Sequence, residues 1–344
     1  MNHYDVVVIG GGWAGLSVSY ALAQAKLRHV VYERGRIGET WRTQRWSSFH
    51  MNTPNVLTVL PGEIYEGNEP EGFMNCATFI KKLENYVECN GLPLVDQTNV
   101  EDVRPAEGKF AVQVASGAVL ADALVIATGN LNVPLVPEMA SKLPPAILQM
   151  HGVEYQRPEL LPDGAVMVVG CGDTGGQIAE ELMLAGRKVY LSTGRNGRVP
   201  RRYRGRDFFL WMSDSKLNQN PRPSGTAGRA LVGRRRTITL QSLSANGVVL
   251  AGRVRDATET GTLHFDNTLS DSVAFADETS AGVKARIDAY IEREAIDALP
   301  AVPDPEETVV PNFPEPPITE LDLISEGVGS VIWATGLTGN FDWL

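Results

Sequence analysis

Residues 4–33 constrain the fold of this chain more than any other stretch. A short apolar run near the N-terminus has the composition of a buried parallel strand and ends in a GxGxxG pattern formed by Gly10, Gly12 and Gly15. A helical pattern follows, and a second apolar run ends in Glu33. Such glycines permit a tight turn, a close approach to pyrophosphate and close helix packing, while the acid accepts hydrogen bonds from ribose hydroxyls. The combination predicts a dinucleotide-binding βαβ unit.

The same arrangement returns about 160 residues later with a different charge at its end. A second apolar run leads into Gly170-x-Gly172-x-x-Gly175 and another helical pattern, and the strand after that helix ends at Ser192 and Arg195 rather than at an acid. An acid would repel a 2′-phosphate, whereas arginine with hydroxyl donors binds one. The second unit therefore predicts an NADP(H) site, and the first suits an adenosine with a free 2′-hydroxyl, as in FAD.

Composition narrows the function classes. The chain has 344 residues, which favours two domains, and its net charge of −10 argues against bulk affinity for nucleic acid. Its three cysteines form no C-x-x-C pair and no metal-ligand spacing, as is typical of reduced thiols in a cytoplasmic protein. No run reaches the roughly 18 apolar residues of a membrane span, and the first strand begins too early for a signal peptide. Six arginines within residues 195–206 nevertheless indicate an anionic partner.

The first half of the chain carries further elements around the first glycine motif. The sequence predicts a helix at 75–90, and three alternating runs within 98–121 predict an antiparallel meander. A separate buried strand is expected at 123–126, ending in the small residues Ala127-Thr128-Gly129. The aromatic stretch 41–49 follows the strand that ends at the ribose-binding acid, so we interpret its side chains, Trp41, Trp46 and Phe49, as cofactor lining.

The second half predicts three elements beyond the second glycine motif. Asn246-Gly247 between apolar runs indicates a β-hairpin within 240–253, and 283–299 has the pattern of an amphipathic helix. A last buried strand at 328–334 ends in a second Ala-Thr-Gly sequence. Pairing the two Ala-Thr-Gly sequences leads to the expectation that the chain returns to the first domain after the second nucleotide unit.

Together these segments resemble the class B flavoprotein monooxygenases of the flavin-containing monooxygenase type, and in particular bacterial proteins related to the plant auxin-forming monooxygenases. The resemblance covers essentially the whole chain and rests on GGGWAG, GETWRTQRW, the first ATG, HGVEY, GCGDTGGQIAEEL, STGR, PRRYRGRD and VIWATG. It implies an α/β fold with two three-layer Rossmann-like dinucleotide-binding domains. The NADP-binding domain (149–321, with an inserted hairpin and helix) interrupts the FAD-binding domain (1–148 and 322–344). Relatives continue for several tens of residues, so the resemblance implies a truncated C-terminal part.

The resemblance also implies two sets of cofactor-binding residues and one catalytic residue. Asn52, in Met51-Asn52-Thr53-Pro54, matches an Asn-x-Pro position that donates a hydrogen bond to the flavin–oxygen adduct; an Asx turn before the proline is an equally good interpretation of the residues alone. The FAD set is Gly10, Gly12, Trp13, Ala14, Gly15, Glu33, Arg34, Thr40, Trp41, Val100, Ala127, Thr128 and Gly129. The NADPH set is Gly170, Gly172, Asp173, Thr174, Gly175, Ser192, Arg195, Arg201 and Arg202.

The activity that this resemblance implies is oxygen transfer from O₂ to a small molecule. NADPH would reduce FAD, and a flavin C4a-hydroperoxide would oxygenate a nucleophilic nitrogen or sulfur, or a carbonyl substrate. Two other interpretations remain open at this point. One is an NADPH-dependent flavin oxidoreductase or oxidase without oxygen transfer, and the other is a truncated, non-catalytic flavin-binding protein.

Overall fold

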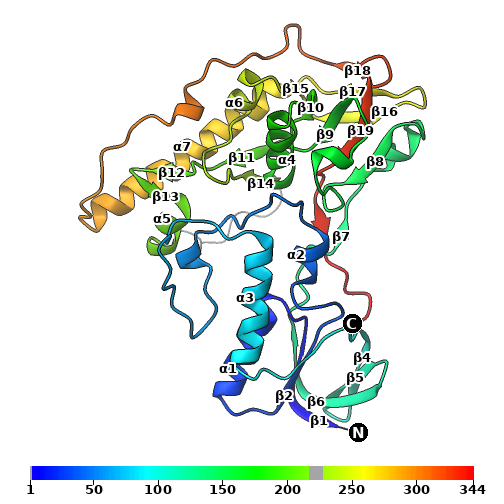
Figure 1. Cartoon of the computed structure of the whole chain (residues 1–344), viewed down its shortest axis with the longest axis vertical. Coiled ribbons are helices and arrows are strands. Elements are labelled where there is room, and N and C mark those ends of the chain that lie inside the picture. Colours follow the sequence, from blue (N-terminus) through cyan, green and yellow to red (C-terminus); the bar gives the residue numbers. More distant parts are fainter. Residues whose placement is uncertain (1, 217–227) are drawn as a thin grey trace. The chain divides into compact units, whose positions relative to one another are not determined.

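The computed structural model describes residues 2–216 and 228–344 (Figure 1). The chain divides into two compact units. The first unit holds residues 1–51, 55–135 and 336–344, and the second unit holds 52–54 and 136–335. The expected α/β class is confirmed.

The first unit is built on a six-stranded sheet in the order β3-β2-β1-β6-β5-β4. Its neighbours β3, β2, β1 and β6 are parallel, whereas β6, β5 and β4 form an antiparallel meander. The elements of this unit are β1 (His3–Ile9), α1 (Trp13–Gln24), β2 (His29–Tyr32), α2 (Glu39–Thr43), η1 (Asn55–Leu57), α3 (Cys76–Cys89), β3 (Leu94–Val95), β4 (Val100–Ala106), β5 (Lys109–Val114), β6 (Gly117–Ile126), β7 (Val133–Pro134) and β20 (Leu337–Thr338).

The second half of β1, from Val6 to Ile9, is apolar because both of its faces are covered. Val6 and Val8 pack toward α1 with Val31 of β2, whereas Val7 and Ile9 pack against the meander. The predicted helix at 75–90 is confirmed as α3, whose N-cap, Asn75, accepts a hydrogen bond from the main-chain N–H of Thr78. The meander is confirmed as well. The strand expected separately at 123–126 is instead the second half of β6, which pairs with β5 at its start and with β1 along most of its length.

The second unit is built on a five-stranded, all-parallel sheet in the order β15-β10-β9-β19-β8. A three-stranded antiparallel sheet, β16-β17-β18, packs against it through a shared apolar core. The elements are η2 (Glu138–Lys142), β8 (Leu148–His151), η3 (Pro158–Leu160), β9 (Ala165–Val169), α4 (Asp173–Leu184), β10 (Val189–Ser192), β11 (Asn196–Arg198), β12 (Arg202–Tyr203), β13 (Arg206–Asp207), α5 (Phe208–Asp214), β14 (Gly228–Leu231), α6 (Leu240–Ala245), β15 (Val249–Ala251), β16 (Val254–Ala257), β17 (Thr262–Phe265), α7 (Leu269–Arg293), η5 (Pro305–Glu307), β18 (Glu320–Asp322) and β19 (Val328–Trp333).

Two predictions for the second unit are wrong. The Asn246-Gly247 pair does not join two hairpin strands, because a capping box between Thr239 and Ser242 starts the helix α6 and Gly247 ends it at φ +98° before β15. The last buried strand, β19, does not return to the first sheet. It lies between β9 and β8 in the second sheet, so the second unit extends to Thr335 and only residues 336–344 rejoin the first unit.

The helix predicted at 283–299 is present but longer and displaced toward the N-terminus. It is α7, a helix of 25 residues that begins at Leu269 and ends at Arg293. Its first half carries small and polar residues at buried positions, including Ser272, Ala276 and Ser280, so the apolar periodicity is weak there.

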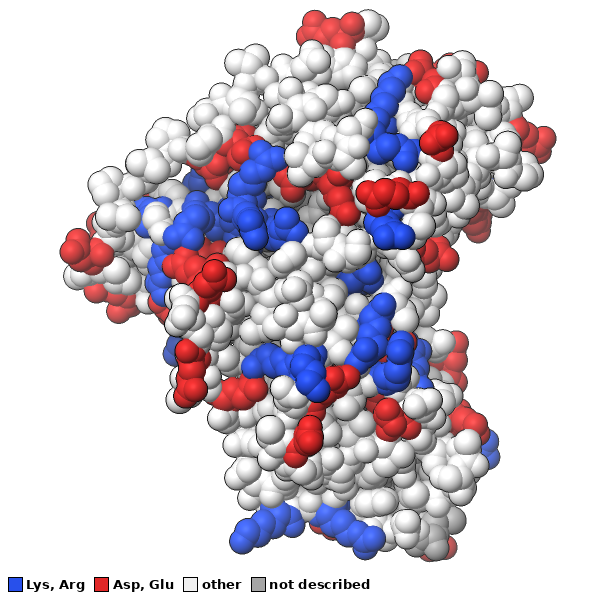
Figure 2. Space-filling model, in the orientation of Figure 1, with Lys and Arg blue, Asp and Glu red and all other residues white. Residues whose placement is uncertain are grey.

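In space-filling view, acidic and basic side chains lie interspersed on the face that Figure 2 shows.

Candidate dinucleotide-binding sites

The glycine turn between β1 and α1 is too tight for side chains at two of its three positions. A Cβ on Gly10 would lie 2.5 Å from the main-chain oxygen of Ala127, and a Cβ on Gly15 would lie 1.8 Å from the oxygen of Gly10. A Cβ on Gly12 would meet nothing within 4 Å. Gly10 and Gly15 are therefore required by packing, whereas Gly12 borders open space, as expected where a phosphate approaches the main chain.

A cavity of about 720 Å³ lies beside this turn, within the first unit. It brings together most of the residues expected to hold FAD, from both ends of the first βαβ unit, from α2, from the start of β4 and from the end of β6. Those that line it are Gly10, Gly12, Trp13, Ala14, Glu33, Arg34, Thr40, Trp41, Val100, Ala127, Thr128 and Gly129. Sequence reasoning missed further lining residues, among them Arg45, Thr98, Asn99, Glu101, Asn130, Leu131, Asn132, Asn340 and Trp343.

The polar groups of this cavity fit a dinucleotide. The N-cap of helix α1 is Gly12, so no side chain caps the helix and its first N–H groups are left for an anion. The carboxylate of Glu33 accepts hydrogen bonds from the main-chain N–H groups of Gly11, at 2.7 Å, and Gly35, at 2.8 Å, and so is fixed at the cavity wall. Among the described residues, the buried hydroxyl oxygen of Thr128 has no hydrogen-bond partner. A bound group with polar atoms would satisfy it.

Of the three aromatic residues after β2, one lines the cavity and two pack against each other away from its lining. Trp41 lines the cavity and packs on Phe79 of α3 with ring centroids 4.7 Å apart. Trp46 is buried and meets Phe49 edge-to-face at 5.0 Å, and neither residue is among those that line this cavity. The interpretation of the whole stretch as cofactor lining is therefore too broad.

The second glycine turn repeats the geometry of the first. A Cβ on Gly170 would lie 2.6 Å from the oxygen of Ala334, and a Cβ on Gly175 would lie 1.8 Å from the oxygen of Gly170. The N-cap of helix α4 is Gly172, so this helix also lacks a side-chain cap. Each glycine turn thus packs against an Ala-Thr-Gly sequence: the first turn against the one that follows β6, and the second against the one that follows β19. The two arrangements match because β19 lies beside β9 in the second sheet, and β6 lies beside β1 in the first.

Several side chains of the expected NADPH set have other partners. The hydroxyl of Ser192 is buried and donates to the carbonyl of Gly252, so it ties β10 to the segment after β15 instead of facing a phosphate. Asp173 accepts a hydrogen bond from the main-chain N–H of Val232 at 3.0 Å. Arg195 is exposed at the end of β10, with its guanidinium 4.6 Å from the ring centroid of Phe275 on α7.

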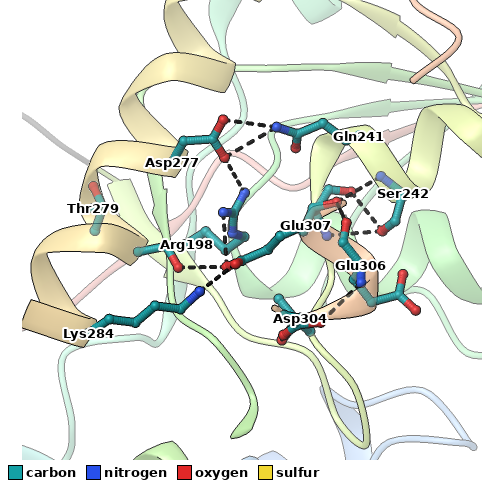
Figure 3. A network of polar contacts seen from close by, with 12 residues as sticks. Arg198, Gln241, Ser242, Asp277, Thr279, Lys284, Asp304, Glu306 and Glu307 are labelled. Carbon is teal, nitrogen blue, oxygen red and sulfur yellow. Dashed lines mark hydrogen bonds and ion pairs between the residues drawn. The ribbon is translucent and has the colours of Figure 1, made fainter. Parts of the chain in front are cut away.

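The arginine cluster at 195–206 is largely neutralised by carboxylates of the same unit. Figure 3 shows Arg198 between Asp277 of α7 and Glu307 of η5. Arg201 is buried and paired with Asp207, which argues against its expected role in phosphate binding. Arg204 pairs with Asp288 and Arg206 with Asp214, while Arg202 donates to the carbonyl of Gly205. The inference of an external anion from this cluster is therefore too broad, because carboxylates of the same unit, some nearby in sequence and some distant, supply partners for most of these arginines.

The expected catalytic residue, Asn52, belongs to the second unit and is held there at two atoms. The side-chain amide of Gln177 donates to Oδ1 of Asn52 at 3.1 Å and to the carbonyl of Val232 at 2.7 Å. The guanidinium of Arg201 donates to the main-chain carbonyl of Asn52 at 2.9 Å. Because Oδ1 accepts from Gln177, the amide nitrogen of Asn52 is the end that is left to donate elsewhere.

Residues 7–207 match the family described as pyridine nucleotide-disulphide oxidoreductase. The chain belongs to this family. The family description mentions a disulphide, but all three cysteines of this chain are free, and burial raises the pKa of the Cys171 thiol to about 11. That thiol stays protonated at neutral pH and is a poor nucleophile.

Individual relatives agree with the resemblance seen in the sequence. An "uncharacterized oxidoreductase CzcO-like" of Geobacillus kaustophilus is 35% identical over 214 residues, 61% of either chain. The indole-3-pyruvate monooxygenase YUCCA1 of rice is 29% identical over 186 residues, 53% of this chain and 46% of that protein. The match to these curated relatives spans between about half and two thirds of their length. The resemblance to class B flavoprotein monooxygenases is thereby confirmed.

Solved structures show the same fold. The flavin-containing monooxygenase from Stenotrophomonas maltophilia superposes with a TM-score of 0.66 at 19% identity, covering 100% of this chain and 81% of that one. Cyclohexanone monooxygenase superposes with a TM-score of 0.55 at 15% identity, covering 100% and 76% of the two chains. At these identities the comparison concerns the fold alone. No helix within residues 2–216 and 228–344 is long and apolar enough to cross a bilayer.

Proposed function

We propose that this chain is an FAD- and NADPH-dependent oxidoreductase of the monooxygenase type. FAD occupies the cavity of the first unit, and NADPH binds at the glycine turn of the second unit, so the two units are Rossmann-like domains of which the second is inserted into the first. The observation that carries this proposal is that the same glycine-turn geometry occurs in both βαβ units, while the residues after their second strands have opposite charge. Gly10 and Gly170 each lie against the main-chain oxygen of the alanine in an Ala-Thr-Gly segment. The first βαβ unit ends in the acid Glu33, whereas the second ends near the base Arg195.

The residues of this chain bind and orient, and the bound cofactors would supply hydride transfer and the activation of O₂. The first N–H groups of α1 and α4, which no side chain caps, would bind the phosphates. Glu33 accepts from the ribose of FAD, and the exposed Arg195 binds the 2′-phosphate of NADPH. Asn52 would act as a hydrogen-bond donor, through its side-chain amide, to the oxygen that is transferred. An amide suits this role because it donates a hydrogen bond without giving up a proton. Gln177 fixes the direction of that amide.

The substrate that fits this chemistry is a small molecule with a nucleophilic nitrogen or sulfur, or a carbonyl group. Oxygen transfer is favoured over disulfide reduction because this chain has no C-x-x-C pair and its buried thiol, Cys171, has a raised pKa. The experiment is to load the protein with FAD, supply NADPH and ¹⁸O₂, and follow amine, sulfide and ketone substrates by mass spectrometry. Label in a product supports the proposal. NADPH oxidation that yields only hydrogen peroxide indicates a flavin oxidase, and failure to bind FAD indicates that the proposal is wrong.

A further inference from the structure

The last residues of the chain form part of the cavity wall in the first unit. Asn340 and Trp343 both line the cavity. The main-chain carbonyl of Trp343 accepts a hydrogen bond from the N–H of Val103 at 3.2 Å, and its indole Nε1 donates to the carbonyl of Asn340 at 3.2 Å. Val103 lies on β4, the last strand of the first sheet. The C-terminal segment is thus fixed to the edge of the sheet that carries the proposed FAD site.

The contacts of Trp343 connect it to β4, whose first residue, Val100, lines the cavity. Trp343 packs against the apolar core of the first sheet, which includes Val100. Two residues before Val100, the main-chain N–H of Thr98 donates to the carbonyl of Glu33 at 2.8 Å. Trp343 is thus bonded to β4, and the residues just before and at the start of β4 line the cavity next to Glu33, so we infer that the indole stands toward the ribose-binding acid.

We propose that Trp343 stacks on the adenine base of the dinucleotide in this cavity. This inference rests on the proposed FAD site and adds the residue that recognises the base. Adenine is flat and uncharged, and the indole has the largest aromatic face among side chains. Stacking of this kind contributes to binding at no cost in buried charge. Residues 340–343 thereby gain a role in binding the base, which the glycine motifs do not indicate.

The experiment compares Trp343→Leu, Trp343→Phe and Phe341→Leu with the wild-type chain. Leucine keeps apolar bulk against the core and the main-chain bond to Val103, but it removes the aromatic face, which phenylalanine retains. Phe341 lies in the same segment, is exposed, and is not among the lining residues, so it is the matched control. Affinity is measured by titration with FAD and by displacement of FAD with ADP, and thermal melting confirms that each variant folds.

We expect Trp343→Leu to weaken both FAD and ADP by the same factor, about tenfold, while Trp343→Phe stays close to wild type and Phe341→Leu is unchanged. Unchanged affinity in Trp343→Leu overturns the inference and leaves the FAD site intact. A loss for FAD without a loss for ADP also overturns it, because the indole then faces the flavin. A wild-type chain that binds neither ligand contradicts the proposed function itself.

Discussion

The carboxylate of Glu33 accepts a hydrogen bond from the main-chain N–H of Gly11 across 2.7 Å. A second bond, from Gly35 at 2.8 Å, occupies its other oxygen. Glu33, which directly follows β2, is therefore bonded to the glycine turn before α1 and also lines the cavity. One residue thus connects the two halves of the βαβ unit and borders the proposed ribose site.

We expect Glu33→Gln to weaken FAD binding by tenfold to a hundredfold. Glutamine retains one acceptor oxygen, but its NH₂ group then faces a main-chain N–H, and charge-assisted bonds of this type contribute about 1.5–3 kcal/mol. Flavin fluorescence during titration measures the change. The matched control is Glu101→Gln, because Glu101 lines the same cavity and is exposed. Equal losses in the two variants would show that only the charge of the cavity matters.

The glycines that end the two turns are expected to be structural. Gly15→Ala and Gly175→Ala each place a Cβ 1.8 Å from a main-chain oxygen, so the turn must open. We expect a loss of about 1–3 kcal/mol or more in the free energy of unfolding. Gly282 lies in α7 with nothing within 4 Å of its added Cβ, so Gly282→Ala is the control and is expected to gain up to about 1 kcal/mol. Urea denaturation distinguishes these outcomes; an unchanged stability in Gly15→Ala would contradict the turn geometry.

Arg195 is expected to select the phosphorylated cofactor. Arg195→Ala should raise the KM for NADPH by about tenfold to a hundredfold and barely change that for NADH, because a charge-assisted contact to the 2′-phosphate is lost. Steady-state kinetics with the two cofactors measures both values, and NADH is the internal control. Equal changes for both would remove Arg195 from the site.

The bond between Gln177 and Asn52 predicts that the two residues share a phenotype. Asn52→Ala removes the donor, and Gln177→Leu removes the group that fixes the direction of the amide. Both variants should release more hydrogen peroxide per NADPH oxidised, with the rate of hydride transfer retained. Stopped-flow reduction and a peroxide assay measure the two steps separately. Normal coupling in Asn52→Ala would refute the catalytic assignment.

The cluster around Glu307 predicts acid sensitivity in the second unit. Burial raises the pKa of Glu307, but hydrogen bonds from Lys284 and Ser280 and the charge of Arg198 outweigh it, so the pKa is lowered from 4.5 (Figure 3). A lowered pKa in the folded state contributes stability above pH 4.5 that is lost as the pH falls through the folded pKa. Glu307→Gln should therefore be less stable than wild type at pH 7, and the difference should shrink below pH 4.5 in urea denaturation. A difference independent of pH would exclude this explanation.

Local patterns predicted the parts of the fold that depend on neighbours in sequence. The strand–glycine–helix units, α3 and the meander all follow from periodicity and turn residues. The place of β19 could not be predicted in this way, since a run buried on both faces suits either parallel sheet and only its pairing with β9 decides. The partners of the arginines were missed for a similar reason. Asp277 and Glu307 lie 79 and 109 residues along the chain from Arg198, and Asp288 lies 84 residues from Arg204.

The cavity shows the same limit. The motif residues Gly10, Gly12 and Glu33 were expected at its wall, because their spacing carries the chemistry. Trp343 and Asn340 were not, because their contribution depends on the C-terminal segment reaching β4 through one main-chain bond, and no sequence pattern encodes that.

The central claim is tested most directly by measuring how much FAD stays bound, by absorption after gel filtration, in wild type and in Gly12→Ala. An added Cβ on Gly12 meets no protein atom within 4 Å but extends into the space proposed for the pyrophosphate. The account predicts about one FAD per wild-type chain, and a Gly12→Ala variant with an unchanged melting temperature and little or no flavin. A wild-type chain without flavin, or a variant that retains it fully, would contradict the account.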